Sequence, residues 1–276
     1  MTDAIPAPSV KVSCLARREE ATTPASRVIP EETAIAFTYG GATHAVMMAT
    51  PADLDDFATG FAITEGLIES DAPALDVEIV VSELGIELRS WLPGQRQEQY
   101  AARRRSMAGP TGCGLCGIES LEQATRDPPV LQNALRVSAT ALIDAMERMP
   151  GAQKLNTETR AVHAAAFWNP ASGLLILRED VGRHNALDKL AGALARRGEA
   201  GSSGVVLMTS RVSVELVQKT ARIGASVIAA ISAPTALAVR TAEACGMTLV
   251  AILRGREFEI FTHPARIIEQ ASSHVA

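Results

Sequence analysis

The sequence predicts an α/β fold, with a layered α/β/α core preceded by a β-rich part. From about residue 159 onward, short apolar segments alternate with helical segments of about 10 to 15 residues, the order typical of a sheet covered by helices. The apolar segments are hydrophobic at consecutive positions, which is typical of strands buried on both faces. The chain has 276 residues, 47% of them hydrophobic, which is enough to bury a substantial core.

The first third of the chain predicts an arm followed by strands and one helix. Prolines at 6, 8, 24 and 30 interrupt any period, so residues 1–30 are expected to form a flexible or extended arm. A hairpin is then expected from Thr33–Tyr39 and Thr43–Thr50, joined at Gly40-Gly41. Thr50-Pro51-Ala52-Asp53 is interpreted as an N-cap with proline at the first helical position, opening a helix that runs to about Ile68. Asp76–Val81 and Gly85–Trp91 are expected to form a second strand pair.

The C-terminal half alternates regularly. Its expected strands are Ala161–Trp168, Leu174–Leu177, Val205–Thr209, Val227–Ile231, Leu249–Leu253 and Phe258–Phe261, and its expected helices cover about 183–197, 213–223 and 234–245. The resulting division of the chain is an arm at 1–30, a β-rich part at 31–105, a mobile Cys-x-x-Cys loop at 106–117 and an α/β core with a cofactor crevice at 118–276.

Composition excludes several classes of protein. The formal net charge is only -5, so no basic field favours nucleic acid. There is no run of 18 apolar residues, and Met1 to Cys14 has neither the basic nor the apolar region of a signal peptide. We therefore expect a cytoplasmic protein that does not enter a membrane.

The stretch from Gly109 to Gly117 reads Gly-Pro-Thr-Gly-Cys-Gly-Leu-Cys-Gly and holds two of the four cysteines. Four glycines and a proline in this stretch oppose regular structure, which predicts that the thiols of Cys113 and Cys116 lie on a mobile loop. The nearby arginines and a helix expected from about Ile118 would favour the thiolate. A thiolate that accepts sulfur as a persulfide fits this setting, with the second thiol as resolving or relaying partner.

Other uses of the pair fit less well. A structural zinc site would need two more ligands, but the chain has no second C-x-x-C and no histidine pair at ligand spacing, so no metal site is predicted. A thioredoxin-like redox pair should follow a buried strand, whereas Gln99 to Arg105 is polar. The same objection makes the G-x-G-x-x-G match at Gly112–Gly117 a chance one.

Three polar clusters follow predicted strands: Arg178–Asn185, Ser210–Ser213 and Ser232–Thr235. Ligands of open α/β sheets bind beyond the carboxyl ends of the strands, where helix N-termini offer unpaired N–H groups and a positive dipole. The serines alone are as consistent with helix caps. The first cluster is denser in polar groups than a cap requires. We expect an anionic or phosphorylated ligand to bind there with help from Arg183, His184, Ser210 and Arg211.

These segments together resemble the FdhD/NarQ family of formate dehydrogenase accessory proteins. The resemblance covers about residues 30–270. The segments that carry it are Cys113–Gly117, Glu179–Lys189, Ser210–Lys219, Ile231–Val239 and Phe258–Ile267.

The resemblance implies a sulfur carrier with sulfurtransferase activity, linked to molybdenum cofactor biosynthesis. Such a protein takes persulfide sulfur from a cysteine desulfurase and delivers it to the molybdenum of a bis(molybdopterin guanine dinucleotide) cofactor required by the formate dehydrogenase catalytic subunit. Cys113 would hold the sulfur and Cys116 would relay it. The cofactor would be a bound client rather than a permanent group, and a homodimer is compatible with the family.

The resemblance also implies a fold similar to that of cytidine deaminases, although the deaminase signature is absent because His163-Ala164-Ala165 lacks the glutamate. Two rival functions stay open: a thiol-disulfide oxidoreductase, which needs no anion pocket, and a non-catalytic cofactor chaperone, which needs no thiols. The residues expected to contact the guanine dinucleotide, besides Arg183, His184, Ser210 and Arg211, are Phe258, Glu259, Ile260, Phe261, Thr262 and His263.

Overall fold

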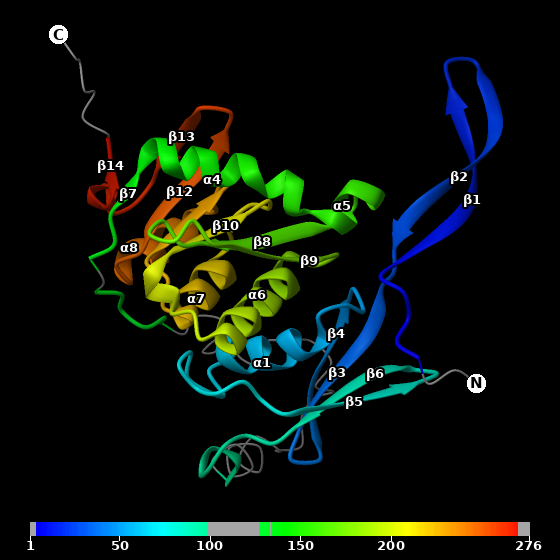
Figure 1. Ribbon diagram of the computed structural model, residues 1–276, viewed down its shortest axis with the longest axis horizontal. Coiled ribbons are helices and arrows are strands. Elements are labelled where there is room, and N and C mark those ends of the chain that lie inside the picture. The colour runs from blue at the N-terminus through cyan, green and yellow to red at the C-terminus, as the bar shows by residue number, and fades with distance from the viewer. Residues whose placement is uncertain (1–3, 99–126, 133, 270–276) are drawn as a thin grey trace.

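The computed structural model describes residues 4–98, 127–132 and 134–269 and confirms the predicted α/β fold (Figure 1). A six-stranded sheet in the order β13-β12-β11-β10-β8-β9 forms the centre of the C-terminal half, and a four-stranded sheet in the order β4-β3-β6-β5 forms the N-terminal part. Within this part of the chain, no helix is both long enough and apolar enough to cross a membrane.

The strands of the central sheet occupy the segments that the apolar runs predict. β9, β10, β11 and β12 run in one direction, because β10, β11 and β12 pair in parallel and β8 pairs antiparallel with both β10 and β9. β13 returns antiparallel beside β12. The bounds are β8 His163–Trp168, β9 Leu175–Asp180, β10 Val205–Met208, β11 Val227–Ala230, β12 Thr248–Arg254 and β13 Glu257–Ile260.

Helices cover both faces of this sheet, because its strands are apolar on both sides. α6 (Arg183–Arg197), α7 (Val214–Ile223) and α8 (Ala236–Ala244) pack on one face, and α4 (Ala139–Ala152) packs on the other. Figure 1 shows α4 lying across the sheet on the side opposite α6 and α7. The remaining short elements of the C-terminal half are α5 (Lys154–Thr159), β7 (Val137–Ser138), β14 (Ile267–Ile268) and the 3-10 turns Gly201–Ser203 and Pro264–Arg266.

The N-terminal part is a sheet with one helix, α1 (Leu54–Thr64), packed between it and the central domain. Its strands are β3 (Thr33–Tyr39), β4 (Ala42–Ala49), β5 (Val77–Ser82) and β6 (Gly85–Ser90). α1 crosses α6 where Gly60 and Gly192 face the opposite backbone: a Cβ on Gly60 would overlap the Asp188 carbonyl, and one on Gly192 would overlap that of Asp56. The absence of side chains at these two positions lets the helices approach closely.

The start of α1 differs from the expected cap at Thr50. The helix begins at Leu54 after Asp53, which has a left-handed φ of 53° and makes no capping hydrogen bond. Thr50 is instead fully buried at the junction of the two parts. Its N–H donates to Asp180 Oδ2 (3.0 Å), and its carbonyl accepts from Lys189 Nζ (2.8 Å).

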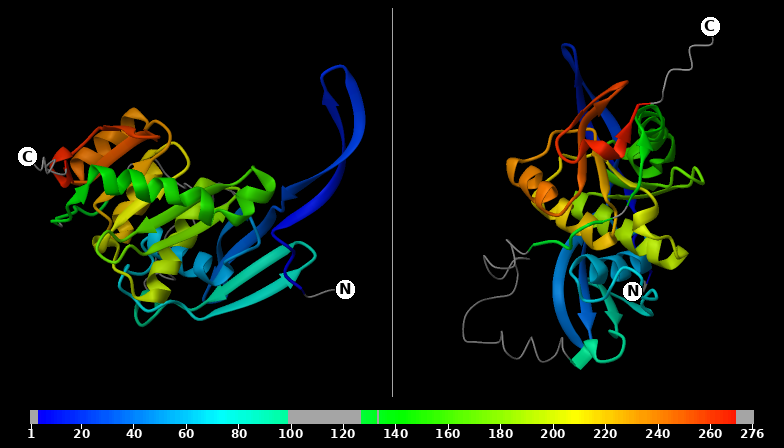
Figure 2. Two further views of the ribbon diagram at one scale, coloured as in Figure 1. Left: turned by 45° about the horizontal axis from the view of Figure 1, so that its top comes forward. Right: turned by 90° about the vertical axis from the view of Figure 1, so that its left-hand side faces the viewer.

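Residues 9–30 contain regular structure that the sequence pattern does not predict. β1 (Ser9–Arg18) and β2 (Ala21–Pro30) form a two-stranded antiparallel sheet of their own. The views in Figures 1 and 2 agree that this hairpin stands away from the rest of the molecule. Both strands are largely exposed, so neither shows the burial-driven alternation by which a strand is recognised.

Candidate functional site

The four parallel strands of the central sheet end at a single edge, here called the carboxyl edge. The loops after β9, β10 and β11 lead there into α6, α7 and α8, so the three predicted polar clusters converge. An isolated bridge between Val212 and Pro234 joins the second cluster to the third. Because α6 and α7 both begin at the carboxyl edge, side chains from their first turns lie close to each other.

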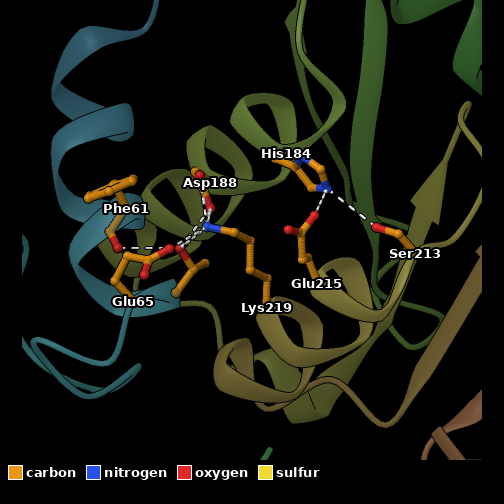
Figure 3. A network of polar contacts seen from close by, with 8 residues as sticks. Phe61, Glu65, His184, Asp188, Ser213, Glu215 and Lys219 are labelled. Carbon is orange, nitrogen blue, oxygen red and sulfur yellow. Dashed lines mark hydrogen bonds and ion pairs between the residues drawn. The ribbon is translucent and has the colours of Figure 1, made fainter. Parts of the chain in front are cut away.

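His184 is the centre of the polar contacts at the carboxyl edge (Figure 3). Its Nε2 lies 2.7 Å from Glu215 Oε2 and 3.3 Å from Ser213 Oγ, and both partners come from the start of α7. The hydrogen bond from His184 lowers the pKa of the Glu215 carboxyl, so Glu215 is ionised and accepts while Nε2 carries the proton. Ser213 occupies the N-cap position of α7, yet its hydroxyl makes no cap and contacts His184 instead.

Arg183 and His163 lie beside this pair. His163, at the start of β8, lies at the same edge because β8 is antiparallel, and burial, followed by the charges of Arg183 and His184, lowers its pKa. Arg183 is the first residue of α6, and its buried Nε has no hydrogen-bond partner among the described residues. An anion would supply the missing acceptor, and the N-terminal dipole of α6 acts in the same direction.

We define the carboxyl-edge cluster as His163, Arg183, His184, Ser213 and Glu215. One turn below it, Asp188 of α6 and Lys219 of α7 form a second ion pair, with 2.9 Å between Nζ and Oδ1. The end of α1 completes that pair, since Thr64 donates to Asp188 and Glu65 accepts from Lys219 (Figure 3). The cluster therefore lies one helical turn from a second group of polar contacts, and this second group also connects α6 and α7 to the end of α1.

The other two residues expected in the crevice have different settings. Ser210 is buried, and its hydroxyl donates to the Arg211 carbonyl (3.0 Å), so it is satisfied within its own loop. Arg211 is exposed on the loop between β10 and α7. Of the predicted residues of this loop, only Arg211 presents its side chain to solvent.

Much of the polar density from Arg178 to Asn185 is structural. Asp180 and Lys189 form a fully buried ion pair (2.6 Å) that joins the two parts of the molecule through Thr50. Asn185 donates to Asp180 and to the Met48 carbonyl of β4. This leaves Arg183 and His184 as the residues of the Arg178–Asn185 segment that are candidates for contact with a ligand.

The segment from Phe258 to His263 is not one surface near the crevice, contrary to the expectation. β13 starts at the carboxyl edge but runs back along β12, so Thr262 and His263 lie at the amino end of β12. There Thr262 donates to the Met247 carbonyl (2.6 Å), and the His263 carbonyl accepts from Thr248 (2.8 Å). Thr262 and His263 therefore lie at the amino ends of the parallel strands, on the side of the sheet opposite the carboxyl edge.

The side chains of β13 and of Phe261, which follows it, lie on different faces of the sheet. Phe258 packs against the core on the α4 side, and Phe261 packs against the core beneath the α6–α8 layer. Glu259 and Ile260 are exposed. Of the six residues, Phe258 lies nearest the β12–β13 turn and hence nearest the carboxyl edge.

Cys113 and Cys116 lie outside the described residues, so their position relative to the cluster stays a prediction. Within residues 4–98, 127–132 and 134–269, no group of three or more His, Cys, Asp or Glu side chains is arranged to hold a metal ion. A polar depression of about 360 Å³ between the start of α1 and the end of α6 is lined by Asp53, Asp56, Arg178 and Arg196, among others. These side chains pair with one another, as in the 2.6 Å contact of Arg178 with Asp56.

Sequence reasoning missed two members of the cluster. Glu215 lies two residues after the predicted cap Ser213. It contacts His184 because the starts of α6 and α7 lie side by side, and this tertiary arrangement cannot be recognised from hydrophobic periodicity. In the sequence, His163 stands out only through the incomplete deaminase signature. The antiparallel direction of β8 places it at the carboxyl edge.

Comparison with known proteins gives consistent results. The FdhD/NarQ family profile matches residues 30–268. The chain is 53% identical to the sulfur carrier protein FdhD of Agrobacterium fabrum over 94% of this chain and 96% of that one. Its identity is 51% to the protein of that name from Brucella abortus (92% and 95% covered) and 48% to that from Cupriavidus necator (88% and 85% covered).

A solved structure has the same fold. The crystal structure of a protein described as a formate dehydrogenase accessory protein from Desulfotalea psychrophila superposes with a TM-score of 0.74, covering 95% of this chain and 100% of that chain. At 23% sequence identity, this likeness supports the fold alone. With the family profile spanning most of its length and a relative more than half identical over nearly all of it, the chain belongs to the FdhD/NarQ family.

Proposed function

We propose that this protein is a sulfur carrier that serves formate dehydrogenase, accepting persulfide sulfur on Cys113 and passing it to a molybdenum cofactor substrate. The names of its relatives support the carrier role, since proteins 48–53% identical to it are sulfur carrier proteins. The Cys113-Gly-Leu-Cys116 stretch supplies the thiols that such a role requires. The sulfur donor would be a cysteine desulfurase, and the site of action would be the cytoplasm.

The chemistry of loading is a thiol exchange. The Cys113 thiolate attacks the outer sulfur of the donor persulfide, a new S–S bond forms, and the donor cysteine leaves as a thiolate. For delivery, the Cys116 thiolate attacks Cys113 Sγ and forms a disulfide, and the outer sulfur departs as hydrosulfide with the two electrons that the thiol pair loses. A low-molecular-weight thiol then reduces the disulfide and resets the carrier.

The carboxyl-edge cluster would hold the phosphates of the guanine dinucleotide portion of the cofactor. The observation that carries this part is the convergence of Arg183 and His163 beside the N-terminus of α6, with the buried Nε of Arg183 lacking an acceptor among the described residues. The fixed His184–Glu215 pair would orient the ligand and limit the room at the edge. Arg211, exposed on the next loop, would contact the same anion.

Intact-mass measurement tests the carrier role. After incubation with a cysteine desulfurase and cysteine, the wild-type protein should gain the mass of one sulfur atom, and Cys113→Ala should not. Cys116→Ala should still load, because the first step uses Cys113 alone. An equal sulfur load on wild type and Cys113→Ala would overturn the assignment.

Calorimetric titration with GDP tests the cluster. Arg183→Ala should weaken binding by about 1.5–3 kcal/mol, the usual contribution of a charge-assisted hydrogen bond. Arg197→Ala is the matched control, because Arg197 is an exposed arginine at the other end of the same helix. Equal losses in the two variants would show that only overall charge matters and that the cluster is no binding site.

A further inference from the structure

The carboxyl-edge cluster contains a carboxylate that anion binding alone does not require. Glu215 lies in the first turn of α7, where its Oε2 is 2.7 Å from His184 Nε2 and 39% of its side chain is exposed (Figure 3). The hydrogen bond from His184 is the main cause of the lowered pKa of Glu215, and the charge of Arg183 contributes to it. The arginine that would attract an anion therefore already interacts with a fixed negative charge.

The buried lysines of α6 and α7 do not offset this negative charge. Lys189 pairs with Asp180 at 2.6 Å, and Lys219 pairs with Asp188 at 2.9 Å, one helical turn from the cluster. Both ammonium groups are held by carboxylates in the interior. Neither is available to a ligand at the carboxyl edge.

The permanent charges of the proposed phosphate site are few. Burial, followed by the charges of Arg183 and His184, lowers the pKa of His163, so this imidazole adds little positive charge at neutral pH. The permanent cations are Arg183 at the start of α6 and Arg211 on the loop before α7. Two arginines against the Glu215 carboxylate leave an excess of one positive charge.

Two helix N-termini add to this charge, because no side chain caps them. The N-cap residues of α6 and α7, Gly182 and Ser213, make no side-chain capping hydrogen bond. Thr235, by contrast, caps α8 by accepting from the Ala238 N–H (3.2 Å). Each helix N-terminus is equivalent to about half a positive charge, so the edge offers about two positive charges to a ligand.

Phosphate esters differ in how well they match this charge. A pyrophosphate that is esterified at both ends carries one negative charge on each phosphate. A free terminal phosphate loses a second proton with a pKa of about 6, so GDP carries an additional charge at pH 8. That charge would leave water without a matching cation and would lie near the Glu215 carboxylate. Charge matching therefore favours the diester.

We propose that Glu215 makes the carboxyl-edge cluster select a pyrophosphate diester over a nucleoside diphosphate with a free terminal phosphate. Glu215 is then a specificity-determining residue, which rejects the wrong ligand by repulsion and does not attract the right one. This inference rests on the proposed function, because it requires that phosphates bind at the cluster. It explains why a carboxylate is held in place beside Arg183 by the His184 hydrogen bond.

GDP and its methyl ester at the terminal phosphate test this selection, because the two differ by one methyl group and one charge. Calorimetric titration at pH 8 should show that the wild type binds the ester about five- to tenfold more tightly. In Glu215→Gln the GDP affinity should rise until the two ligands bind almost equally, because glutamine keeps an oxygen acceptor for His184 but has no charge. Equal binding of both ligands by the wild type, or an unchanged ratio in Glu215→Gln, would overturn the proposal.

Two further variants separate selection from damage to the site. Glu215→Asp keeps the charge and should still prefer the ester. Glu147→Gln removes one charge from an exposed position of α4, on the opposite face of the sheet, and should leave the ratio of the two affinities unchanged. A distorted site would lower both affinities, whereas selection by Glu215 predicts a gain in GDP affinity. An equal change of the ratio in Glu147→Gln and Glu215→Gln would show that overall charge sets the preference, against the proposal.

Arg183→Ala distinguishes failure of this inference from failure of the proposed function. If Arg183→Ala weakens binding of both ligands while the wild type does not discriminate between them, phosphates bind at the cluster and Glu215 does not select among them. If Arg183→Ala changes neither affinity, or if neither ligand binds the wild type, the cluster is no phosphate site and both conclusions fail.

Discussion

Lys219 of α7 and Asp188 of α6 form an ion pair whose carboxylate is almost completely buried, with 2.9 Å between Nζ and Oδ1. Burial opposes the charge of Lys219, but the carboxylates of Asp188 and Glu65 outweigh it and raise the lysine pKa. Burial also raises the pKa of Asp188, although Lys219 and Thr64 favour its ionised form. Each charge is therefore tolerated in the interior only because the other is present.

Lys219→Met should destabilise the protein by about 3–5 kcal/mol, because it leaves the Asp188 charge buried without a partner. Urea unfolding measures this loss. Lys154→Met, at an exposed lysine on α5, should change the unfolding free energy by about 0.5 kcal/mol or less. Adding Asp188→Asn to Lys219→Met should recover part of the loss. Strictly additive effects in this cycle would contradict the pairing.

Gly192→Ala should destabilise the fold by about 1–3 kcal/mol, because its new methyl group must push α6 away from the α1 backbone. Gly151→Ala is the control. That glycine also lies in a helix, but its Cβ would meet no other atom, and the change should stabilise α4 by roughly 0.5–1 kcal/mol. Thermal unfolding should show a lower midpoint temperature for Gly192→Ala and a higher one for Gly151→Ala. Equal changes in the two midpoints would argue against close contact between α1 and α6.

His163 should titrate below the ordinary histidine range, because burial and the charges of Arg183 and His184 lower its pKa. Its contribution to stability is present above the unfolded histidine pKa and is lost as the pH falls through the lower folded value. Arg183→Gln should raise the His163 pKa only in part, since burial is the larger cause. NMR titration of the His163 imidazole measures this pKa. An unchanged pKa in Arg183→Gln would show that the charge of Arg183 does not act on His163.

Loading and cofactor binding should be separable. Cys113→Ala should lose its sulfur load and keep GDP affinity close to wild type, because the glycine-rich stretch that the sequence predicts to be a mobile loop would contribute little to a site built on the core. Arg183→Ala should weaken GDP binding while still accepting sulfur, because Arg183 belongs to the carboxyl-edge cluster and takes no part in loading. Calorimetry and intact-mass measurement on the same samples compare the two. Parallel losses in Cys113→Ala would show that loop and site act as one unit.

The central strands and the helices from α6 onward could be predicted because they bury apolar side chains. The helix expected at 183–197 is observed as Arg183–Arg197, and the strand expected at 205–209 is observed as Val205–Met208. Apolar runs and capping residues encode such elements locally. The hairpin of β1 and β2 was missed because its strands are exposed, and α4 received no prediction.

The arrangement of the site could be predicted only in part. Because the polar clusters directly follow predicted strands, the sequence is enough to predict that Arg183 and His184 lie at the same edge of the sheet as the loop after β10. The position of Thr262 and His263 depends on β13 reversing direction beside β12, which is a tertiary pairing. The number of polar residues in Arg178–Asn185 also predicts too many ligand contacts. Asp180 and Asn185 instead form hydrogen bonds with Thr50 and Met48 at the junction with the N-terminal part.

The buried Asp180–Lys189 pair has a consequence for how the molecule unfolds. Both side chains are fully shielded from water, and Thr50, directly after β4, forms hydrogen bonds with both of them. If the N-terminal sheet detached, an aspartate and a lysine in the core would lose these partners at once, and an intermediate with only one folded half would carry that cost. The two halves should thus melt in a single cooperative transition, and neither should persist as a fragment when expressed alone.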